Sequence, residues 1–271
     1  MSFRLGLAHY TVLEVPPLEL VALAARIGYT SIGLRLHPAF PGAPSYEIAA
    51  SSAAMREMRR RLDDEGIRVY DIEFVIVGED FVPERLAGMF ESASQLGAER
   101  LSICGDDPDR SRLTANVAAL CDLAADFGMG VDLEGMAWRQ VSSFPDALQV
   151  VQTAGKPNGA ALVDALHLAR TGGSPSDLRG VAPGLIRSAQ LCDAPATIPA
   201  SEEAIIQEAR SGRLPPGEGE LPLCALLAAL PTDTRLSVEV PMGNGLSAEV
   251  RARHIFAATQ TLFERCASCV P

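Results

Sequence analysis

The feature that most constrains the fold of this chain is a regular alternation of short apolar segments with amphipathic segments, repeated eight times along the sequence. Apolar runs bounded by turn residues are typical of buried strands, and apolar residues three and four positions apart are typical of helices. Strands that alternate with helices predict a parallel sheet covered by helices. An eightfold repeat in 271 residues predicts a single (β/α)8 TIM barrel over residues 1–271, because such barrels typically use about 250 residues.

The expected elements follow from the same pattern. We expect strands at residues 3–9, 30–36, 67–77, 100–104, 131–135, 159–164, 185–193 and 236–241. We expect helices at residues 18–27, 53–65, 83–96, 112–127, 143–155, 176–181, 201–211, 221–230 and 246–266. The alternative is a doubly wound open sheet, which calls for a glycine-rich turn after its first strand. Here that position reads His9-Tyr-Thr-Val, so the closed barrel is favoured.

Charge and hydropathy limit the partners that we expect. The net charge is −11, from 23 basic and 34 acidic residues, which argues against nucleic acid, since that partner usually selects a basic face. No apolar run approaches the roughly 18 residues of a membrane span, and the amino terminus does not look like a signal peptide. We therefore expect a cytoplasmic protein without a membrane partner.

The cysteines give no metal or redox signature. Of six, only Cys266 and Cys269 form a CxxC, and no second pair matches them. A zinc site or a redox pair is therefore disfavoured. The expectation is reduced, mostly buried cysteines.

Polar residues end four of the expected strands. Glu134 closes the fifth, Asp164 the sixth, Gln190 the seventh and Glu239 the eighth. In a barrel all carboxyl ends face one mouth, so these side chains are expected to lie together. Any one of them alone could be a helix cap or a partner of an arginine. As a set, three carboxylates and an amide oxygen predict a site for one divalent ion, Mn²⁺ or Mg²⁺, because such ions prefer oxygen ligands and relieve the repulsion among the acids.

The chain resembles the xylose-isomerase-like TIM barrels, the sugar phosphate isomerase/epimerase superfamily. The motifs are Glu134 in a VDLEG strand, Asp164-x-x-His167-x-x-Arg170, Gln190 near Asp193, Arg213 ahead of Pro216-Gly-Glu-Gly219, and Glu239 before Pro241. The resemblance implies Glu134, Asp164, Gln190 and Glu239 as metal ligands, although many relatives have histidine where Gln190 stands. The endonuclease relatives use three zinc ions in a histidine-rich site, and a chain with four histidines does not fit that branch.

Other candidates concern the substrate. His167 follows the sixth strand and could pack in the core, but the resemblance implies that it faces substrate, donating a hydrogen bond or moving a proton. Arg213 could grip substrate oxygens or be a solvated loop charge. Arg35, His37 and Glu73 end the second and third strands and could line the opposite wall. Trp138 could cover a sugar face or pack on a helix.

Three functions remain in view. The first is an isomerase or epimerase of a sugar or keto-polyol, in which Glu134 and Glu239 exchange a proton alpha to a carbonyl and the metal stabilises an enediolate. The second is a lyase that dehydrates 3-dehydroshikimate or inosose after the same first step. The third is a sugar-binding scaffold, which would not need three buried acids. A homo-oligomer is compatible with the resemblance.

Overall fold

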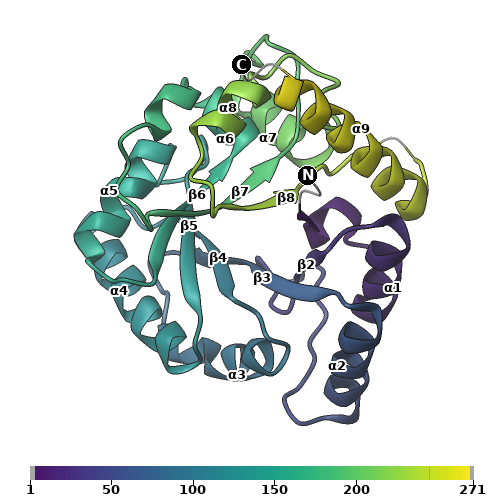
Figure 1. Ribbon diagram of the computed structural model, residues 1–271. Helices are drawn as coiled ribbons and strands as arrows, with labels where there is room; N and C mark the ends of the chain where they lie inside the picture. Colours follow the sequence, from purple (N-terminus) through teal and green to yellow (C-terminus); the bar gives the residue numbers. More distant parts are fainter. Residues whose placement is uncertain (1–3, 244, 269–271) are drawn as a thin grey trace.

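Eight parallel strands close into a barrel in chain order, with β1 paired to both β2 and β8. The computed structural model describes residues 4–243 and 245–268. Figure 1 shows the strands at the centre and the helices around them. The strands are β1 (Leu5–Leu7), β2 (Ser31–Leu34), β3 (Arg68–Val77), β4 (Arg100–Gly105), β5 (Gly130–Glu134), β6 (Gly159–Asp164), β7 (Ile186–Leu191) and β8 (Arg235–Val238). The predicted TIM barrel is confirmed.

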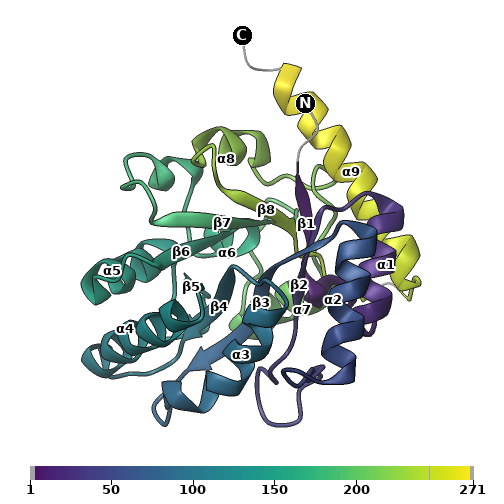
Figure 2. The ribbon, with the colours of Figure 1, turned by 60° about the horizontal axis from the view of Figure 1, so that its bottom comes forward.

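The outer layer consists of helices that follow the strands. They are α1 (Pro17–Ile27), α2 (Ala53–Glu65), α3 (Ala87–Gln95), α4 (Arg110–Asp126), α5 (Phe144–Ala154), α6 (Ala165–Arg170), α7 (Glu202–Ser211), α8 (Leu223–Ala229) and α9 (Ala248–Ser268). Short 3₁₀ turns complete the set: η1 (His9–Val12), η2 (Pro83–Leu86) and η3 (Pro175–Leu178). In Figure 2, α9 lies along α1, so the last helix covers the first.

Capping residues explain where these helices begin and end. Ser143 accepts a hydrogen bond from the Asp146 amide at the start of α5, and Gly155, at φ 65°, ends it. Asp164, the last residue of β6, accepts from the His167 amide and so begins α6 directly. Such caps satisfy amides that have no partner within the helix. The cap at Asp164 therefore fixes the position of His167 relative to the end of β6.

Two expectations about local structure are wrong. The sixth helix was expected at 176–181, but α6 occupies 165–170 and only η3 forms near the expected place. The physical reason is the Asp164 cap, together with Gly180 at φ 79°, a conformation that does not continue a helix. The first expected strand is also longer than β1, because the chain turns into η1 at His9; its first residue, Phe3, lies outside the described residues.

The cysteine expectation is wrong for two residues. Cys224 in α8 and Cys266 in α9 form a disulfide, with their Cα atoms 5.2 Å apart. The two helices lie side by side although their cysteines are 42 residues apart, and the sequence pattern did not reveal that proximity. Cys104, Cys121 and Cys192 are free and buried, as expected. Cys269, the other half of the CxxC, lies outside the described residues.

Among residues 4–243 and 245–268, no helix combines the length and the apolar character that crossing a membrane would require.

Candidate active site

The four predicted ligands lie at one end of the barrel. Glu134 and Asp164 are the last residues of β5 and β6, Gln190 lies opposite Asp164 in β7, and Glu239 follows β8. All four are buried. Gln190 Nε2 donates to Glu239 Oε1 at 3.1 Å. Because parallel strands end at the same mouth, residues far apart in sequence form one acidic cluster.

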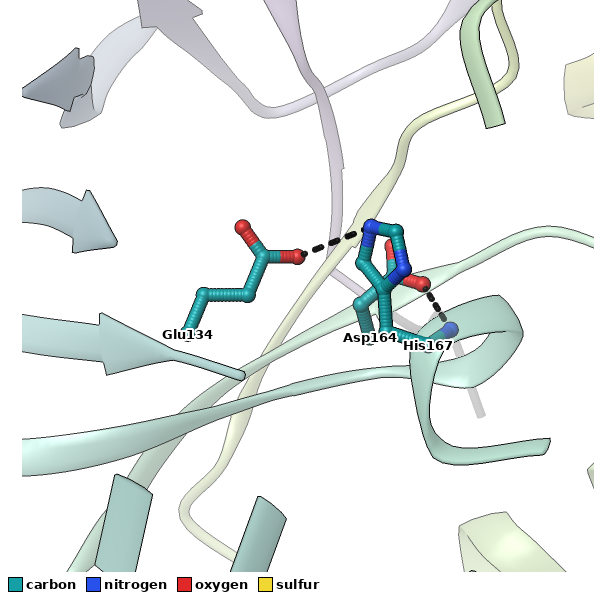
Figure 3. A group of neighbouring side chains, drawn as sticks. All are labelled: Glu134, Asp164 and His167. Atoms are coloured by element: carbon teal, nitrogen blue, oxygen red, sulfur yellow. Dashed lines mark hydrogen bonds and ion pairs between the residues drawn. The ribbon is translucent and has the colours of Figure 1, made fainter. Parts of the chain in front are cut away.

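His167 joins this cluster from α6. Figure 3 shows Glu134 on β5 pointing toward the His167 ring, with the Asp164 side chain partly behind that ring. His167 Nε2 lies 3.7 Å from Glu134 Oε1, and the His167 amide donates to Asp164 Oδ1 at 2.8 Å. Potential ligand atoms of the three residues lie within 4.8 Å of one another, close enough to share one ion. The Trp138 and His167 rings pack in a T-shaped arrangement, with their centroids 5.1 Å apart.

Arg213 supplies a fixed positive charge to the cluster. Its Nη1 donates to Asp164 Oδ2 at 2.6 Å and its Nη2 lies 3.1 Å from Glu239 Oε2. Its Nε donates to the Ala209 carbonyl at 3.0 Å, so all three guanidinium nitrogens have a partner. The residue is 3% exposed. Arg213 is therefore a buried ion-pair partner of two predicted ligands, not a solvated loop charge.

Burial and neighbouring charges shift the pKa values of the three acids in different directions. Burial raises the pKa of Glu134 well above its ordinary value, and Asp164 and Glu239 add to that shift. Burial also raises the pKa of Glu239 to about 7, although Arg213 opposes it. For Asp164 burial acts the same way, but Arg213 and His167 outweigh it and lower the pKa. Asp164 is thus the acid that stays ionised.

His167 is neutral in this setting. Burial lowers its pKa to about 4, although Asp164 opposes that shift. Arg213 Nη2 lies 3.5 Å from His167 Nε2. Because a guanidinium only donates, the compatible neutral tautomer carries its proton on Nδ1. That atom is buried and has no partner among the described residues.

The residues present fit a divalent ion. Glu134 Oε1 and Gln190 Oε1 are buried oxygens without a hydrogen-bond partner in the described chain. Buried polar atoms are normally paired, so such orphans mark a place where a ligand binds. Carboxylate and amide oxygens are the donors that Mg²⁺ and Mn²⁺ prefer.

A cavity opens above the cluster, and its far wall comes from the first three strands. Arg35 and Glu73 both line it, as the sequence predicted. Glu73 accepts from the amides of His9 at 2.6 Å and Tyr10 at 3.0 Å. Gly33 in β2 leaves the room for this, since a Cβ there would collide with the Glu73 carboxylate. Burial raises the pKa of Glu73 to about 7, with Asp71 adding to the shift.

The structure separates His37 from this group. His37 is half-buried and lines a neighbouring hollow with Phe81 and Arg85. Sequence reasoning also missed cavity-lining residues, namely Tyr10, Phe74, Ser102, Met136, Arg139 and Arg210. Tyr10 could have been found by the strand-end rule that identified the others, since it follows β1. Arg210 lies on α7, in a connection whose path the sequence does not reveal.

Comparison with known proteins finds one kind of curated enzyme that is similar to this chain in sequence. A curated 3-dehydroshikimate dehydratase of Pseudomonas putida is 26% identical over 153 residues, which is 54% of this chain. The match covers 24% of that relative, so the chain spans about a quarter of its length.

Two solved structures share the barrel. A xylose isomerase-like TIM barrel/4-hydroxyphenylpyruvate dioxygenase fusion protein has a TM-score of 0.79 at 21% identity, over 98% of this chain and 43% of the other. The IOLI protein, solved with a bound zinc atom, has a TM-score of 0.78 at 20% identity, over 98% and 99% of the two chains. At these identities the likeness concerns the fold.

A family model described as xylose isomerase-like TIM barrel matches residues 21–259, which includes all four strand-end residues and His167. The resemblance noted from the motifs is thereby confirmed. The chain belongs to the family of xylose isomerase-like TIM barrels.

Proposed function

We propose that this protein is a divalent-metal-dependent isomerase or epimerase that removes a proton from the carbon next to a carbonyl group of a sugar or keto-polyol. The observation that carries the proposal is the buried cluster at the strand ends, with the unpartnered oxygens of Glu134 and Gln190 beside two further carboxylates. A binding scaffold would have no need for so many buried acids, whose desolvation opposes folding.

In this proposal Glu134, Asp164, Gln190 and Glu239 hold one Mn²⁺ or Mg²⁺ ion. When bound, the ion supplies Lewis-acid stabilisation of negative charge on substrate oxygen. Arg213 keeps Asp164 ionised and holds it in place through the 2.6 Å contact. The buried setting strengthens these electrostatic interactions, since water is excluded.

Proton transfer belongs to Glu134 and Glu239. Burial raises the pKa of both, that of Glu239 to about 7, and a carboxyl group with a raised pKa is a stronger base that can take a proton and return it. His167 Nδ1, which carries the proton in the tautomer set by Arg213, donates a hydrogen bond to a substrate oxygen. Trp138 and Tyr10 line the same cavity and shield it from water.

A second candidate is a dehydratase. It begins with the same proton abstraction, after which the substrate loses the hydroxyl group one carbon further on, together with a proton, as water. The curated 3-dehydroshikimate dehydratase that matches over half of this chain favours it. In this reaction His167 or a protonated carboxyl group gives the leaving hydroxyl its proton.

The test compares two substrates with the Mn²⁺-loaded protein in deuterated water. Deuterium entering fructose beside the carbonyl, detected by NMR, supports the epimerase. Aromatic product from 3-dehydroshikimate, detected by ultraviolet absorbance, supports the dehydratase. Absence of both reactions with every keto-polyol tried would refute the shared step.

The matched variants are Glu239→Gln and Glu218→Gln. Glu239→Gln should release the metal, measured by elemental analysis, and should reduce the rate by about a thousandfold, since it removes both a ligand and a proton-transfer group. Glu218 lies on the nearby loop, where it pairs with His254, and its variant should behave as wild type. Full activity of Glu239→Gln, or of protein treated with EDTA, would contradict the proposal.

A further inference from the structure

Four arginines are buried in the described part of the chain, and one of them differs from the rest. Arg170 donates to Glu208 and to the Pro195 carbonyl, and Arg213 is paired as described above. Arg251 contacts Glu14 and donates to the Leu246 carbonyl. Arg35 is 4% exposed, and its Nε, like that of Arg251, has no partner among the described residues. Of the four, Arg35 is the one whose guanidinium makes no hydrogen bond to another described residue, its nearest charged partner being Glu73.

Two aromatic rings pack against the guanidinium of Arg35, and the Nε on its edge has no hydrogen-bond partner among the described residues. Its Cζ lies 5.2 Å from the centre of the Tyr10 ring and 5.1 Å from the centre of the Phe74 ring. Its ion pair with Glu73 is 3.8 Å long, beyond hydrogen-bond range, and the Glu73 oxygens already accept two backbone amides. The aromatic rings therefore hold a charged donor in place without satisfying its N–H groups.

This donor lines the same cavity as the acidic cluster. Arg35, Tyr10 and Phe74 line it together with Glu134, Gln190 and Glu239. A buried guanidinium without hydrogen bonds is costly, and an anion that accepts from its edge offsets that cost. A substrate held at the cluster can thus place a second group against Arg35.

We infer that Arg35 binds a carboxylate group of the substrate. The substrate is then an acidic keto-polyol and not a neutral sugar. The inference rests on the proposed function, because it assigns the second end of the same substrate. A planar carboxylate matches the Nε–Nη edge in a bidentate pair. A guanidinium edge binds phosphate as well as carboxylate, but phosphate sites commonly also use backbone amides of glycine-rich turns and helix N-termini or a lysine. The described residues that line this cavity include neither glycine nor lysine, which favours the carboxylate.

Trp138 allows binding to be measured without turnover. It is the one tryptophan of the chain and lines the cavity, so its fluorescence reports occupancy. The probes are quinate, a carboxylated cyclohexane polyol, its uncharged methyl ester, and fructose 6-phosphate beside fructose. Wild-type protein should bind quinate at least tenfold more tightly than methyl quinate.

The variants separate a carboxylate contact from a structural role. Arg35→Met should weaken quinate binding by tenfold or more and leave methyl quinate within about twofold, so that the preference for the acid disappears. Arg35→Lys should retain part of the preference, since it keeps the charge but loses the planar fork. Arg85→Met removes the same charge from an exposed position beside the neighbouring hollow and should leave the preference intact. A structural role alone would weaken both ligands equally.

Equal binding of quinate and its ester by wild type, a preference that survives in Arg35→Met, or a larger Arg35-dependent gain for fructose 6-phosphate would each overturn the carboxylate assignment. The solvent-exchange assay distinguishes this from failure of the proposed function. If no substrate exchanges deuterium but the Arg35-dependent preference for quinate is present, the proposed reaction is refuted and the assignment of Arg35 as the carboxylate-binding residue stands. If a neutral ketose exchanges deuterium and quinate is not preferred, the proposed reaction stands and the Arg35 assignment is refuted.

Discussion

His9 shows how one buried side chain holds the wall opposite the acidic cluster. Its Nδ1 accepts from the Arg35 amide at 3.0 Å, and its Nε2 lies 2.9 Å from the Val15 carbonyl. This arrangement requires the neutral ring with its proton on Nε2. Burial lowers the pKa of His9 to about 4, with the carbonyl contact opposing that shift. Protonation would place a second donor against the Arg35 amide.

The lowered pKa of His9 makes its contribution to the free energy of unfolding depend on pH. The unfolded chain binds a proton at His9 with a pKa near 6.5, but the folded chain does so only near 4. At His9 the unfolded state therefore takes up more protons between these values, and the contribution of His9 to stability is lost as pH falls through them. At pH 5 the loss relative to pH 7.5 should be about 2 kcal/mol from His9 alone. Glu73, Glu134 and Glu239, whose pKa values are raised, act in the opposite direction. The His9 contribution is therefore measured as the difference between wild type and His9→Gln in urea unfolding in EDTA at the two pH values.

His9→Gln should remove this contribution, so the change in its stability from pH 7.5 to pH 5 should be about 2 kcal/mol more favourable than in wild type, although the variant is less stable at pH 7.5 because it gives up the contact with the Arg35 amide. His254→Gln alters an exposed histidine on α9 and should retain the wild-type dependence. His167 contributes with the same sign, since its pKa is also lowered to about 4, so some dependence should remain in His9→Gln. An unchanged difference between pH 7.5 and pH 5 in His9→Gln would contradict this account.

At this scale the sequence predicted the residues that end strands. Glu134, Asp164, Gln190 and Glu239 were expected together because the strand rule places them at one mouth, and the structure does bring them together. The sequence did not predict that Arg213 forms ion pairs with both Asp164 and Glu239. Such pairing depends on the path of a long connection, which hydrophobic periodicity does not encode.

At the scale of elements, Asp193 organises the connection between β7 and α8. Its carboxylate accepts from the amides of Ala194, Gly217 and Leu221, each at 2.9 Å. Its backbone forms an antiparallel bridge with Leu214, the residue next to Arg213. Gly219 packs against the same carboxylate, where a Cβ would collide with it. The loop that carries Arg213 is therefore folded around one buried acid.

Asp193→Ala should loosen this loop and weaken the site from a distance. Removing a carboxylate that accepts three amides should lower the free energy of unfolding by about 3 kcal/mol. Hydrogen exchange at residues 212–221 should accelerate more than in the barrel strands. Glu220→Ala is the matched control, because Glu220 accepts only the Ala196 amide from an exposed position. Equal protection of residues 212–221 in Asp193→Ala and wild type would contradict the assignment.

Most elements were predicted because glycine, serine and proline mark their ends. The helix at 53–65 has the expected bounds, with Ser52 capping it and Gly66 ending it. The sixth helix was misplaced because a strand-end aspartate served two purposes, as a candidate ligand and as a cap. The sequence indicates both roles, but the hydrophobic pattern does not show that the cap begins α6 directly after β6.

At the scale of the whole molecule, the alternating pattern determines the barrel and the net charge narrows its partners. Closure places β8 beside β1, with Leu7 opposite Val238, and so brings α9 against α1. Tyr29 donates to the Ala252 carbonyl across that contact, and its ring packs against Phe256 in a T-shaped arrangement. A repeat of eight strand–helix units predicts this closure. It does not specify how α8, in the longest connection, sits against α9.

The Cys224–Cys266 disulfide should stabilise the closure of the barrel. It links residues 42 positions apart, and a loop of that length corresponds to about 4 kcal/mol in the chain-entropy model, because the crosslink restricts the unfolded state. Cys224→Ser should lower the urea midpoint as much as dithiothreitol does, and the reductant should have little further effect on the variant. The double variant Cys224→Ser, Cys266→Ser should match the single one, since both remove the same bond. The prediction is contradicted if reductant leaves the urea midpoint of wild type unchanged. It is also contradicted if the double variant is destabilised by the sum of the two single effects, since one bond cannot be lost twice.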